Sequence, residues 1–484
     1  MPIVQSGLIT EERERRHIAD PTITPIPTAL HTDLYHVDAA YVAWKSGQMG
    51  DATFDLYTRS NPFGGGFMLV AGLEPALDYL RAFKYSWQDR EYLERIKRYE
   101  PGFLEYLRNL RFTGEILAIP EGEIAFPNES LLRVTAPFPE ALIIESGLLR
   151  SVGISTLIAT KAARLTLAAK GRTISDFAFR RAHEPFLAAR SGYIGGSAST
   201  SFVAAAREYG IPGSGTIPHA LVQAYADELT AFRAVATALP EYSLLLDTYD
   251  VAQGLENAIT VATEAAARHG HRLTAVRLDS GDLGADSRIC RARLDDANMQ
   301  DVRVLVSGDI DEYKIETLVN AGAAVDGFGV GGSLGVGLGT IESGSIGGVI
   351  GAVYKLAWYG GDQNEGASAR IKLAGGGEKS TWPGRKVPYR VGDFEHDLIE
   401  LEGRLAPPNS RPLMHAVVTD GHLLAEPSSI REARGRAQQS MLALPDRLRK
   451  LTVDEQYEVR MSEAVQKLHD DTIATLNANP VKSG

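Results

Sequence analysis

The middle of the chain alternates short apolar runs with longer stretches of helical character. From Ile211 onward the runs begin roughly 20 to 30 residues apart, about the length of one strand and one helix. This alternation predicts a parallel sheet covered by helices, and six or seven such units could close into a barrel. The runs are TISDFAF (173–179), IPGSGT (211–216), YSLLLDTYD (242–250), LTAVRLDSGD (273–282), VRVLVSGDI (302–310) and AVDGFGVGG (324–332).

The flanking segments follow other patterns. Between Phe54 and about Ser146, short β-like runs separated by helical stretches predict a mixed α and β region. Further on, AVYKLAWYG (352–360) predicts a strand, and residues 453–477 predict an amphipathic helix packed on the body. We therefore divide the chain into an N-terminal arm (1–30), an α+β domain (31–150), an α/β barrel (151–345) and a C-terminal segment (346–484).

Composition narrows the class of protein. The 484 residues are 44% hydrophobic and 23% charged, which is typical of a globular protein with two or three domains. The net charge of −11 gives no general attraction to nucleic acid or to an anionic membrane. The single cysteine, Cys290, excludes a disulfide within the chain and a cysteine-rich zinc site.

No targeting or membrane signal is evident. The first twenty residues contain no apolar core of a secretory signal, and no apolar stretch approaches the length of about 18 residues that spans a bilayer. We expect a cytoplasmic enzyme that binds neither nucleic acid nor membrane.

Polar residues collect at the ends of the predicted barrel strands. Catalytic residues of such barrels lie at the carboxyl ends of the strands, so six polar ends predict one shared cleft. Asp, Gly and Ser are also common in turns and helix caps, but six ends in register argue against coincidence. The residues are Arg180, Arg181, Ser214, Gly215, Thr216, His219, Asp247, Asp250, Arg277, Asp279, Ser280, Asp282, Ser307, Gly308, Asp309, Gly329, Gly331, Gly332 and Ser333.

These residue types favour an anionic, phosphorylated substrate. The SGD and GVGGS segments place flexible backbone ahead of helix starts, where free N–H groups suit phosphate. Arg180, Arg181 and Arg277 could clamp phosphate or carboxylate with two hydrogen bonds each. A structural salt bridge is the alternative role, above all for Arg181.

Acidic residues and one histidine add further candidates. Asp247, Asp279 and Asp309 could hold Mg²⁺ through water, although Asp309 could instead cap a helix. His219 follows a Gly-Ser-Gly-Thr turn at a strand end, which suits a chemical role as well as a structural one.

Segments along most of the chain resemble the nicotinate phosphoribosyltransferase family. They appear in the family's order from about Thr32 to Arg390, which is more specific than any single motif. The segments are HTDLYHVDAAYVAWKSG, FDLYTRSNPFGGGFMLVAGLEPALDYL, FAFRRAHEP, IPGSGTIPHALVQAY, LLDTYD, VRLDSGDL, VSGDIDEYKI, FGVGG, AVYKL and TWPGRKVPYR.

The resemblance implies a type II phosphoribosyltransferase. Its fold would be an incomplete (β/α) barrel of six to seven units, with a partly β N-terminal domain completed by C-terminal segments. The enzyme would form a homodimer with sites at the interface. It would convert nicotinate and phosphoribosyl pyrophosphate to nicotinate mononucleotide and pyrophosphate in NAD biosynthesis, using Mg²⁺ and ATP, with ATP hydrolysis coupled through a phosphorylated histidine.

The resemblance also implies roles for individual residues near the pyridine. His219 matches the phosphorylated histidine, and Thr216 lies in the same motif. Tyr35 and Phe177 match an aromatic pair that sandwiches the ring, with Tyr35 coming from the other subunit. Arg180 matches an arginine near the ring and the ribose.

Further matches concern the ribose, the phosphates and the metal. Arg277 and Asp279 match an Arg-x-Asp pair at the ribose and phosphates. The resemblance and the residue types together give the remaining candidates, which are Ser307, Gly308, Gly331 and Gly332 for phosphate, Asp247 and Ser201 for substrate, and Asp279 and Asp309 for the metal.

Several positions depart from the family pattern. Ser199 occupies a position where the family has a glycine, and Phe202 occupies a position where the family has a polar residue. Pro218 and Ala220 flank His219, and Pro218 fixes a backbone angle and removes an N–H donor. Gly332 replaces a hydroxyl-bearing residue.

Three alternatives remain. A nicotinamide phosphoribosyltransferase would carry an aspartate where this chain has Ser201, and a carboxylate there would repel nicotinate whereas a serine would not. A non-catalytic pyridine-nucleotide binder would not need the whole set of Arg180, His219, Arg277 and Asp279. An unrelated phosphosugar enzyme would not explain the matches outside the barrel.

Overall fold

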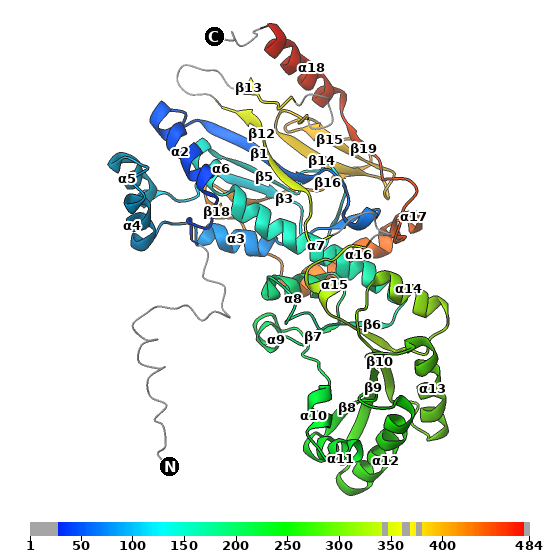
Figure 1. Cartoon of the computed structure of the whole chain (residues 1–484). Helices are drawn as coiled ribbons and strands as arrows, with labels where there is room; N and C mark the ends of the chain where they lie inside the picture. Colours follow the sequence, from blue (N-terminus) through cyan, green and yellow to red (C-terminus); the bar gives the residue numbers. More distant parts are fainter. Residues whose placement is uncertain (1–27, 341–346, 361–367, 374–379, 479–484) are drawn as a thin grey trace, which may run out of the picture.

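The computed structural model describes residues 28–340, 347–360, 368–373 and 380–478. The arm expected at residues 1–30 lies almost wholly outside this part of the chain. Figure 1 shows an upper half, built around antiparallel sheets, and a lower half, built around a curled parallel sheet. The long helix α7 (Glu145–Ala169) leads from the first half into the second.

Segments from both ends of the chain build the upper half. Its seven-stranded sheet has the order β13-β12-β1-β5-β3-β17-β18, and β1 pairs antiparallel with the C-terminal β12 on one side and with β5 on the other. Phe54 of β1 stacks on Tyr354 of β12, with ring centroids 4.6 Å apart. The expectation that C-terminal segments complete the N-terminal domain is therefore confirmed. The strands are β1 (Asp51–Thr58), β3 (Glu115–Ala118), β5 (Leu132–Pro137), β12 (Ala352–Tyr359), β13 (Ser368–Ala369), β17 (His415–Thr419) and β18 (His422–Leu423), with the small pair β2 (Met68–Leu69) and β4 (Ile124–Ala125) beside them.

Helices and a second sheet cover this half. The helices are α2 (Leu34–Ser46), α3 (Leu73–Arg81), α4 (Trp87–Arg95), α5 (Pro101–Asn109), α6 (Phe138–Ile143), α16 (Ile430–Ala443), α17 (Asp446–Arg449) and α18 (Glu463–Ala478), with a short 3-10 turn, η1 (Pro62–Gly64). The second sheet has the order β16-β14-β15-β19, made of β14 (Lys386–Val391), β15 (His396–Leu401), β16 (Ser410–Pro412) and β19 (Val459–Met461).

The C-terminal helix is shorter than its pattern suggested. A helix was expected over residues 453–477, but α18 begins only at Glu463. The preceding residues form β19, which pairs parallel with β15 through Val459 and Asp397. Backbone hydrogen bonds to the sheet therefore override the helical periodicity in this segment.

The lower half is an open α/β barrel. Its six parallel strands have the order β7-β6-β11-β10-β9-β8, and β7 and β8 form the two free edges of this sheet. The predicted fold class, an incomplete barrel of six to seven units, is confirmed with six strands. The strands are β6 (Thr173–Asp176), β7 (Ser199–Thr200), β8 (Glu241–Leu245), β9 (Arg272–Leu278), β10 (Arg303–Val306) and β11 (Gly327–Val330). The helices are α8 (Pro185–Ile194), α9 (Val203–Tyr209), α10 (His219–Gln223), α11 (Glu228–Ala238), α12 (Val251–His269), α13 (Leu283–Asp296), α14 (Glu312–Asn320) and α15 (Gly332–Gly335).

One expected barrel strand was wrong. The apolar run at Ile211 forms no strand, and β7 occupies the sheet position next to β6 instead. The backbone of the run meets β7 in a single parallel bridge from Gly213 to Thr200, and Ser214 Oγ lies 2.6 Å from Ser199 Oγ. Pro212 has no N–H to donate, and the glycines at 213 and 215 favour irregular backbone, so this segment cannot continue a ladder.

Aspartate caps fix where three helices of the barrel begin. Asp250, Asp282 and Asp311 each accept a hydrogen bond from the backbone N–H three residues further on, at 2.8, 3.0 and 2.8 Å. Each cap follows the carboxyl end of a strand, so the loops between strand and helix are short and held at both ends.

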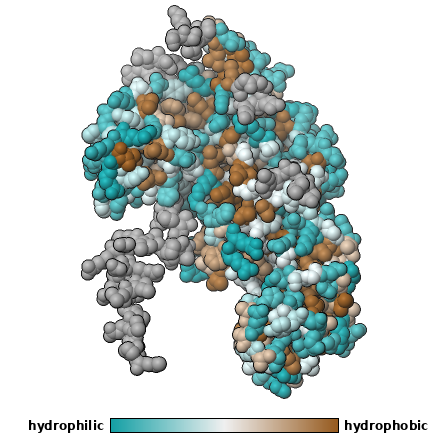
Figure 2. All heavy atoms as spheres, viewed as in Figure 1, coloured by the Kyte–Doolittle hydropathy of each residue, from teal (hydrophilic) through white to brown (hydrophobic). Residues whose placement is uncertain are grey.

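The helix α7 forms the core between the two halves. Among the described helices it alone is long and apolar enough to cross a membrane, yet 83% of its most apolar window is buried inside the protein. Figure 2 shows a largely hydrophilic outer surface, with hydrophobic residues in several separate groups, one of them near the middle of the view.

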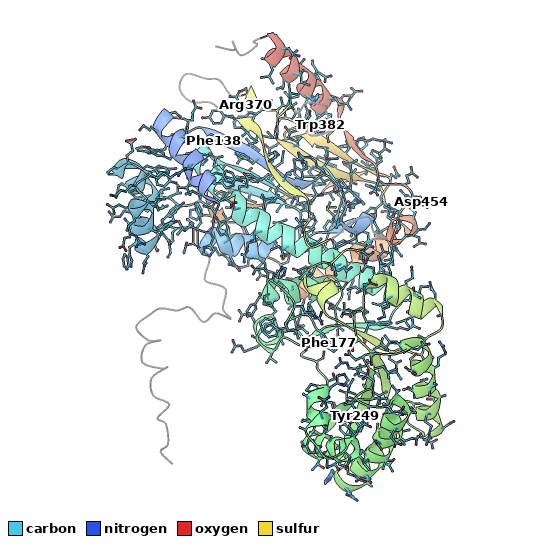
Figure 3. All side chains as sticks on the ribbon, viewed as in Figure 1. Phe138, Phe177, Tyr249, Arg370, Trp382 and Asp454 are labelled. Atoms are coloured by element: carbon cyan, nitrogen blue, oxygen red, sulfur yellow. The ribbon has the colours of Figure 1, made fainter. Side chains whose placement is uncertain are left out.

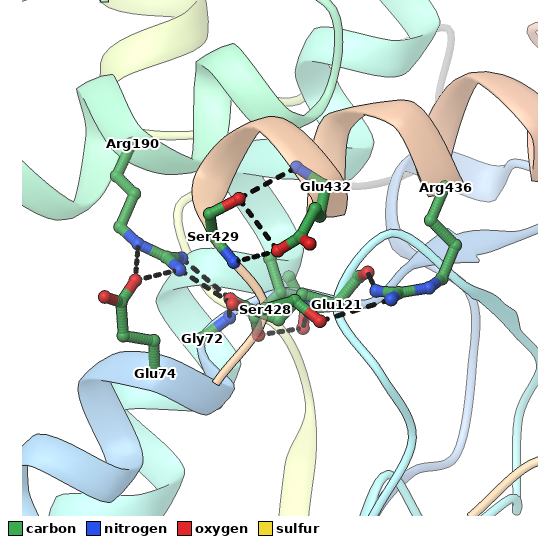
Figure 4. Close-up of polar contacts among 10 residues, drawn as sticks. Gly72, Glu74, Glu121, Arg190, Ser428, Ser429, Glu432 and Arg436 are labelled. Atoms are coloured by element: carbon green, nitrogen blue, oxygen red, sulfur yellow. Dashed lines mark hydrogen bonds and ion pairs between the residues drawn. The ribbon is translucent and has the colours of Figure 1, made fainter. Parts of the chain in front are cut away.

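A buried ion pair network joins the halves (Figure 4). Arg190 of α8 is 1% exposed; its Nε donates to Glu74 of α3 at 2.8 Å and its Nη1 to Glu121 at 2.7 Å. Glu121 also accepts a hydrogen bond from the N–H of Gly72 at 2.6 Å, and its carbonyl accepts one from Arg436 of α16 at 2.5 Å. Because breaking a buried ion pair typically costs about 3–5 kcal/mol, this network holds the barrel firmly against the upper half.

Candidate active site

A cavity of about 510 Å³ opens at the carboxyl ends of four barrel strands. Phe177 follows β6, Asp279 follows β9, Ser307 follows β10 and Gly331 follows β11. The volume suits a small phosphorylated ligand. The wall is formed by Phe177, Arg180, Arg181, Arg277, Asp279, Ser307, Gly308, Asp309, Ile310, Asp311, Gly329, Gly331, Gly332, Ser333, Leu338, Gly339 and Thr340.

Arg277 connects three segments of this site. Its Nε donates to Ser307 Oγ at 2.6 Å, its Nη1 to Thr216 Oγ1 at 2.7 Å and its Nη2 to Asp279 Oδ1 at 2.5 Å. Its guanidinium carbon also lies 5.9 Å from the centre of the Phe177 ring. A planar guanidinium bonded on all sides keeps a fixed orientation, so its positive charge is held in the cavity wall.

Asp279 is kept ionised in this network. Burial alone would raise its pKa, but the hydrogen bonds from Ser307 and Arg277 outweigh that effect and lower the pKa below its ordinary value. The backbone N–H of Asp279 donates to Asp247 Oδ2 at 2.9 Å, and Ser280 Oγ donates to the same oxygen at 2.6 Å. Asp247 thus supports the loop after β9 from the neighbouring strand end.

At two positions of the cavity wall only glycine fits. Gly308 has φ +89°, and a Cβ there would lie 1.9 Å from the carbonyl oxygen of Asp279. A Cβ at Gly329 would lie 2.4 Å from the Phe177 ring. The first glycine lets the two loops cross, and the second leaves room for the aromatic ring against β11.

Arg180 and Arg181 are exposed and line the same cavity. Neither guanidinium group has a hydrogen-bond or ion-pair partner in the described part of the chain. The salt bridge considered for Arg181 is therefore not formed among these residues. Two unpaired guanidinium groups beside Arg277 concentrate positive charge in the cavity wall, which suits an anion.

Asp309 also lines the cavity, and its capping alternative is wrong. The cap of α14 is Asp311, whose carboxylate accepts from the N–H of Lys314. Asp309 itself is exposed with φ +46° and has no partner among the described residues. Its carboxylate is thus free to meet a ligand.

Within the described residues, no group of three His, Cys, Asp or Glu side chains is placed to hold a metal. The hydrogen bonds that Asp279 accepts use only Oδ1, which leaves Oδ2, and Asp309 is free. Mg²⁺ takes about six oxygen ligands, so these two carboxylates fit it only when ligand oxygens and water complete the shell.

His219 lies beside the cavity rather than in its wall. It is the first residue of α10, and its Nδ1 is 3.1 Å from Thr248 Oγ1. It is near enough to Asp279 to help lower the pKa of that carboxylate. Thr248 therefore orients the ring, and Nε2 has no partner in the described part of the chain.

Tyr35 and Ser201 lie outside the cavity of one chain. Tyr35 is on α2 in the upper half and is 60% exposed, with the ring of His36 tilted at 40° to its own and the ring centroids 3.9 Å apart. The backbone of Ser201 donates to the carbonyl of Asp176 at 2.8 Å, and its neighbour Phe202 stacks on Phe179 with ring centroids 4.1 Å apart. Figure 3 shows Phe177 close to the junction of the halves and Tyr249, beyond β8, farther down the barrel.

Sequence reasoning missed two parts of the site. Asp176, at the end of β6, accepts hydrogen bonds from the N–H of Ala178 at 2.8 Å and from Thr200 Oγ1 at 2.7 Å, and so fixes the turn that carries Phe177. A lone aspartate in a buried strand run was the available signal. The wall segment Leu338–Thr340 was also missed, although its glycine-rich sequence GVGLGT was visible.

Family models match two parts of the chain. The nicotinate phosphoribosyltransferase N-terminal domain matches residues 30–153, and the C-terminal domain of the same family matches residues 401–469. Both matched segments contribute to the upper half of the structure, while its strands β12, β13 and β14 lie in the part of the chain between them.

Whole proteins match over most of the chain. A nicotinate phosphoribosyltransferase of Mycobacterium tuberculosis is 38% identical over 432 residues, covering 87% of this chain and 89% of that protein. The one from Bacillus subtilis is 40% identical over 370 residues, covering 75% and 73%. The crystal structure of human nicotinic acid phosphoribosyltransferase superposes with a TM-score of 0.78 at 29% identity, covering 91% of this chain and 99% of the human one.

Proposed function

The chain belongs to the nicotinate phosphoribosyltransferase family, and on that premise we propose that it transfers the phosphoribosyl group of phosphoribosyl pyrophosphate to nicotinate. The products are nicotinate mononucleotide, a precursor of NAD, and pyrophosphate. The observation that carries the proposal is the cavity in which the bonded pair of Arg277 and Asp279 faces glycine-rich loops and two unpaired arginines.

The loops after β10 and β11 offer a site for the 5-phosphate. The backbone N–H groups of Gly308, Gly331 and Gly332 donate to no acceptor in the described part of the chain. Free N–H groups of this kind and the nearby Arg181 bind a phosphate dianion well. Ser307 is less available, because its hydroxyl already bonds Arg277 and Asp279.

The pyridine ring is placed against Phe177. An aromatic face binds a flat heterocycle by stacking, and Arg180 lies close enough in the wall to pair with the ring carboxylate. In the proposed homodimer, Tyr35 of a second copy covers the other face of the ring. The exposure of Tyr35 on α2 supports this arrangement, since its own chain leaves 60% of the residue uncovered.

The reaction needs no protein nucleophile. The bond between C1 of the ribose and the pyrophosphate oxygen breaks while the pyridine nitrogen donates its lone pair to C1, and no proton moves. Positive charge develops on the ribose, where the ionised Asp279 stabilises it, and Arg277 and Arg180 offset the charge growing on the pyrophosphate. Asp279 and Asp309 are the residues that would hold Mg²⁺, which would supply further neutralisation of the negative charge on the pyrophosphate.

The site favours nicotinate, the acid, over nicotinamide, the amide, as substrate. Ser201 brings no charge to the site, and the nearby carboxylate of Asp176 is buried with its hydrogen bonds already made. Unpaired arginines attract a carboxylate ring substituent by charge as well as by hydrogen bonds, whereas a neutral amide offers them a hydrogen-bond acceptor without the charge.

ATP enters as a co-substrate through His219. Nε2 takes the γ-phosphoryl group of ATP and releases ADP, and water later removes the phosphoryl group as phosphate. Phosphorylation adds negative charge beside Asp279, which changes the field around the cavity that binds phosphoribosyl pyrophosphate. All of these co-substrates are cytoplasmic metabolites, and the proposal places the reaction in the cytoplasm.

A competition assay tests the proposal. The purified protein is given equal concentrations of nicotinate and nicotinamide with phosphoribosyl pyrophosphate and Mg²⁺, with and without ATP. Nicotinate mononucleotide should dominate the products. Faster use of nicotinamide would overturn the substrate, and binding of the substrates without release of pyrophosphate would make the protein a non-catalytic binder.

A further inference from the structure

A fully buried ion cluster lies behind the cavity. Lys161 and Arg164 project from α7 toward Glu312, the first residue of α14, and the three side chains are 0%, 1% and 1% exposed. Both cations also lie over the ring of Phe63, at 4.9 and 5.5 Å. None of these residues is part of the cavity wall, so the cluster touches no ligand directly.

The two acceptors of Lys161 belong to different walls of the cavity. Its Nζ donates to a carboxylate oxygen of Glu312 and to the carbonyl oxygen of Leu338 at 2.7 Å. Glu312 directly follows the wall segment Ser307–Asp311, and Leu338 begins the wall segment Leu338–Thr340. A single ammonium group therefore sets the position of both segments relative to α7.

Arg164 has a different set of partners. Its Nε donates to Glu312 at 3.0 Å, its Nη1 to the carbonyl of Leu451 at 2.9 Å and its Nη2 to Tyr313 Oη at 3.2 Å. These bonds anchor α14 to the C-terminal segment and do not reach Leu338. Removing the ammonium group alone would leave the pair of Arg164 and Glu312 balanced in charge.

Both wall segments contain backbone that is costly to order, although each also has local hydrogen bonds, such as that from Lys314 Nζ to the carbonyl of Gly308 at 3.0 Å and that from the N–H of Leu338 to the carbonyl of Ser333 at 2.9 Å. The first contains Gly308 at φ +89° and Asp309 at φ +46°, and the second contains Gly339. Backbone of this kind loses much conformational entropy when it is ordered, so an outside anchor has a measurable effect on ligand binding. Burying a lysine is costly, and burial lowers the pKa of Lys161 against the opposing effect of Glu312.

We propose that Lys161 is a positioning residue that holds these two walls at the separation required to bind phosphoribosyl pyrophosphate. The inference rests on the proposed function for the identity of the ligand. Lys161 is buried and lies outside the cavity, yet it should affect the binding of phosphoribosyl pyrophosphate and leave the binding of nicotinate unchanged.

The test compares two lysines that join the same two helices. Lys161→Met removes the ammonium group and keeps an apolar stem of similar length. Lys170→Met is the matched control, because the exposed Lys170 at the end of α7 bonds Asn320 at the far end of α14, at 2.8 Å. Calorimetric titration with phosphoribosyl pyrophosphate, steady-state kinetics for both substrates and thermal unfolding are measured for each protein.

Lys161→Met should fold and bind phosphoribosyl pyrophosphate about tenfold or more weakly than the wild type, in both Kd and KM. Its KM for nicotinate and its kcat should stay within about threefold, since the ring site is untouched. Lys161→Arg, which keeps charge and donors, should recover part of the loss. Lys170→Met should match the wild type in all of these quantities.

Several results would overturn the proposal. An unchanged Kd in folded Lys161→Met, or equal losses in the Lys170→Met control, would do so. If neither Lys161→Met nor Lys161→Gln folds, the lysine serves the fold rather than the site. The binding comparison also separates the two claims: a wild type that binds phosphoribosyl pyrophosphate without turnover defeats the proposed function and leaves Lys161 to be decided by Kd, whereas no binding defeats both.

Discussion

Arg277 Nε lies 2.6 Å from Ser307 Oγ, so the end of strand β9 is bonded directly to the end of strand β10. The same guanidinium bonds Thr216 and Asp279, and no other side-chain type offers donors in three directions from one rigid plane. This relationship fixes both the charge and the shape of the cavity between the two strand ends.

Arg277→Lys should therefore be far from conservative. A lysine keeps the charge but cannot bond Ser307, Thr216 and Asp279 at once, so we expect kcat/KM to fall roughly 100-fold or more with the fold retained. The control is Arg272→Lys, at the amino end of the same strand, where the exposed side chain pairs with Glu241. Steady-state kinetics and circular dichroism check both variants, and equal activity in the two would remove the role of the network.

His219 should matter only for the coupling to ATP. In His219→Ala we expect the stimulation by ATP to disappear while basal transfer continues, because the histidine lies outside the cavity wall. Initial rates with and without ATP, together with the ADP formed, give the answer. An unchanged response to ATP would rule out phosphorylation at this residue.

Tyr35 should act across a subunit interface. Tyr35→Ala and Arg277→Met should each be nearly inactive alone. When the two proteins are unfolded together, refolded and reassorted, half of the dimers would carry one intact site, which restores about a quarter of the wild-type activity. No recovery in verified mixed dimers would show that Tyr35 does not serve the partner's cavity.

Glu140 should make the stability of the fold depend on pH. Burial raises the pKa of this carboxyl to about 7, against the hydrogen bonds from Thr113. Its pKa in the unfolded chain is about 4.5. The free energy of unfolding therefore falls as pH rises from about 4.5 to about 7, and this loss of stability is constant at higher pH.

Glu140→Gln should remove this loss of stability. The variant should be more stable than the wild type at pH 8, by about 3 kcal/mol at most, and the gain should shrink toward pH 5. Thermal unfolding at both values checks the sign, with the exposed Glu94→Gln as control. A gain that is larger at pH 5 would mean that Glu140 is stabilised as a carboxylate.

Much of the barrel was predictable because its signals are local. The strand runs around Asp247, Arg277 and Ser307 are apolar and end in polar residues, and parallel strands bring such ends to one edge. The strand predicted at Ile211 was wrong because the apolar pattern does not show that Pro212 lacks an N–H donor, or that the neighbouring glycines form a poor β-ladder. The sequence also could not show that Asp311 and not Asp309 caps the helix, since aspartate is a good N-cap residue at either position.

The rest depends on contacts between residues distant in sequence. Lys161 and Glu312 are 151 residues apart, and their patterns give no hint that they meet. The same holds for Arg190 and Glu121, which join the two halves. Tyr35 has no partner in the cavity of its own chain, so its role can be tested only in an assembly.

The most direct test of the central claim is product stoichiometry. Purified protein is incubated with nicotinate, phosphoribosyl pyrophosphate and Mg²⁺, and nicotinate mononucleotide and pyrophosphate are quantified in the same samples, with Arg277→Met in parallel. We predict equal molar amounts of the two products from the wild type and almost none from the variant. Absence of nicotinate mononucleotide with the wild-type protein, or full activity of the variant, would contradict the claim that this cavity transfers the phosphoribosyl group.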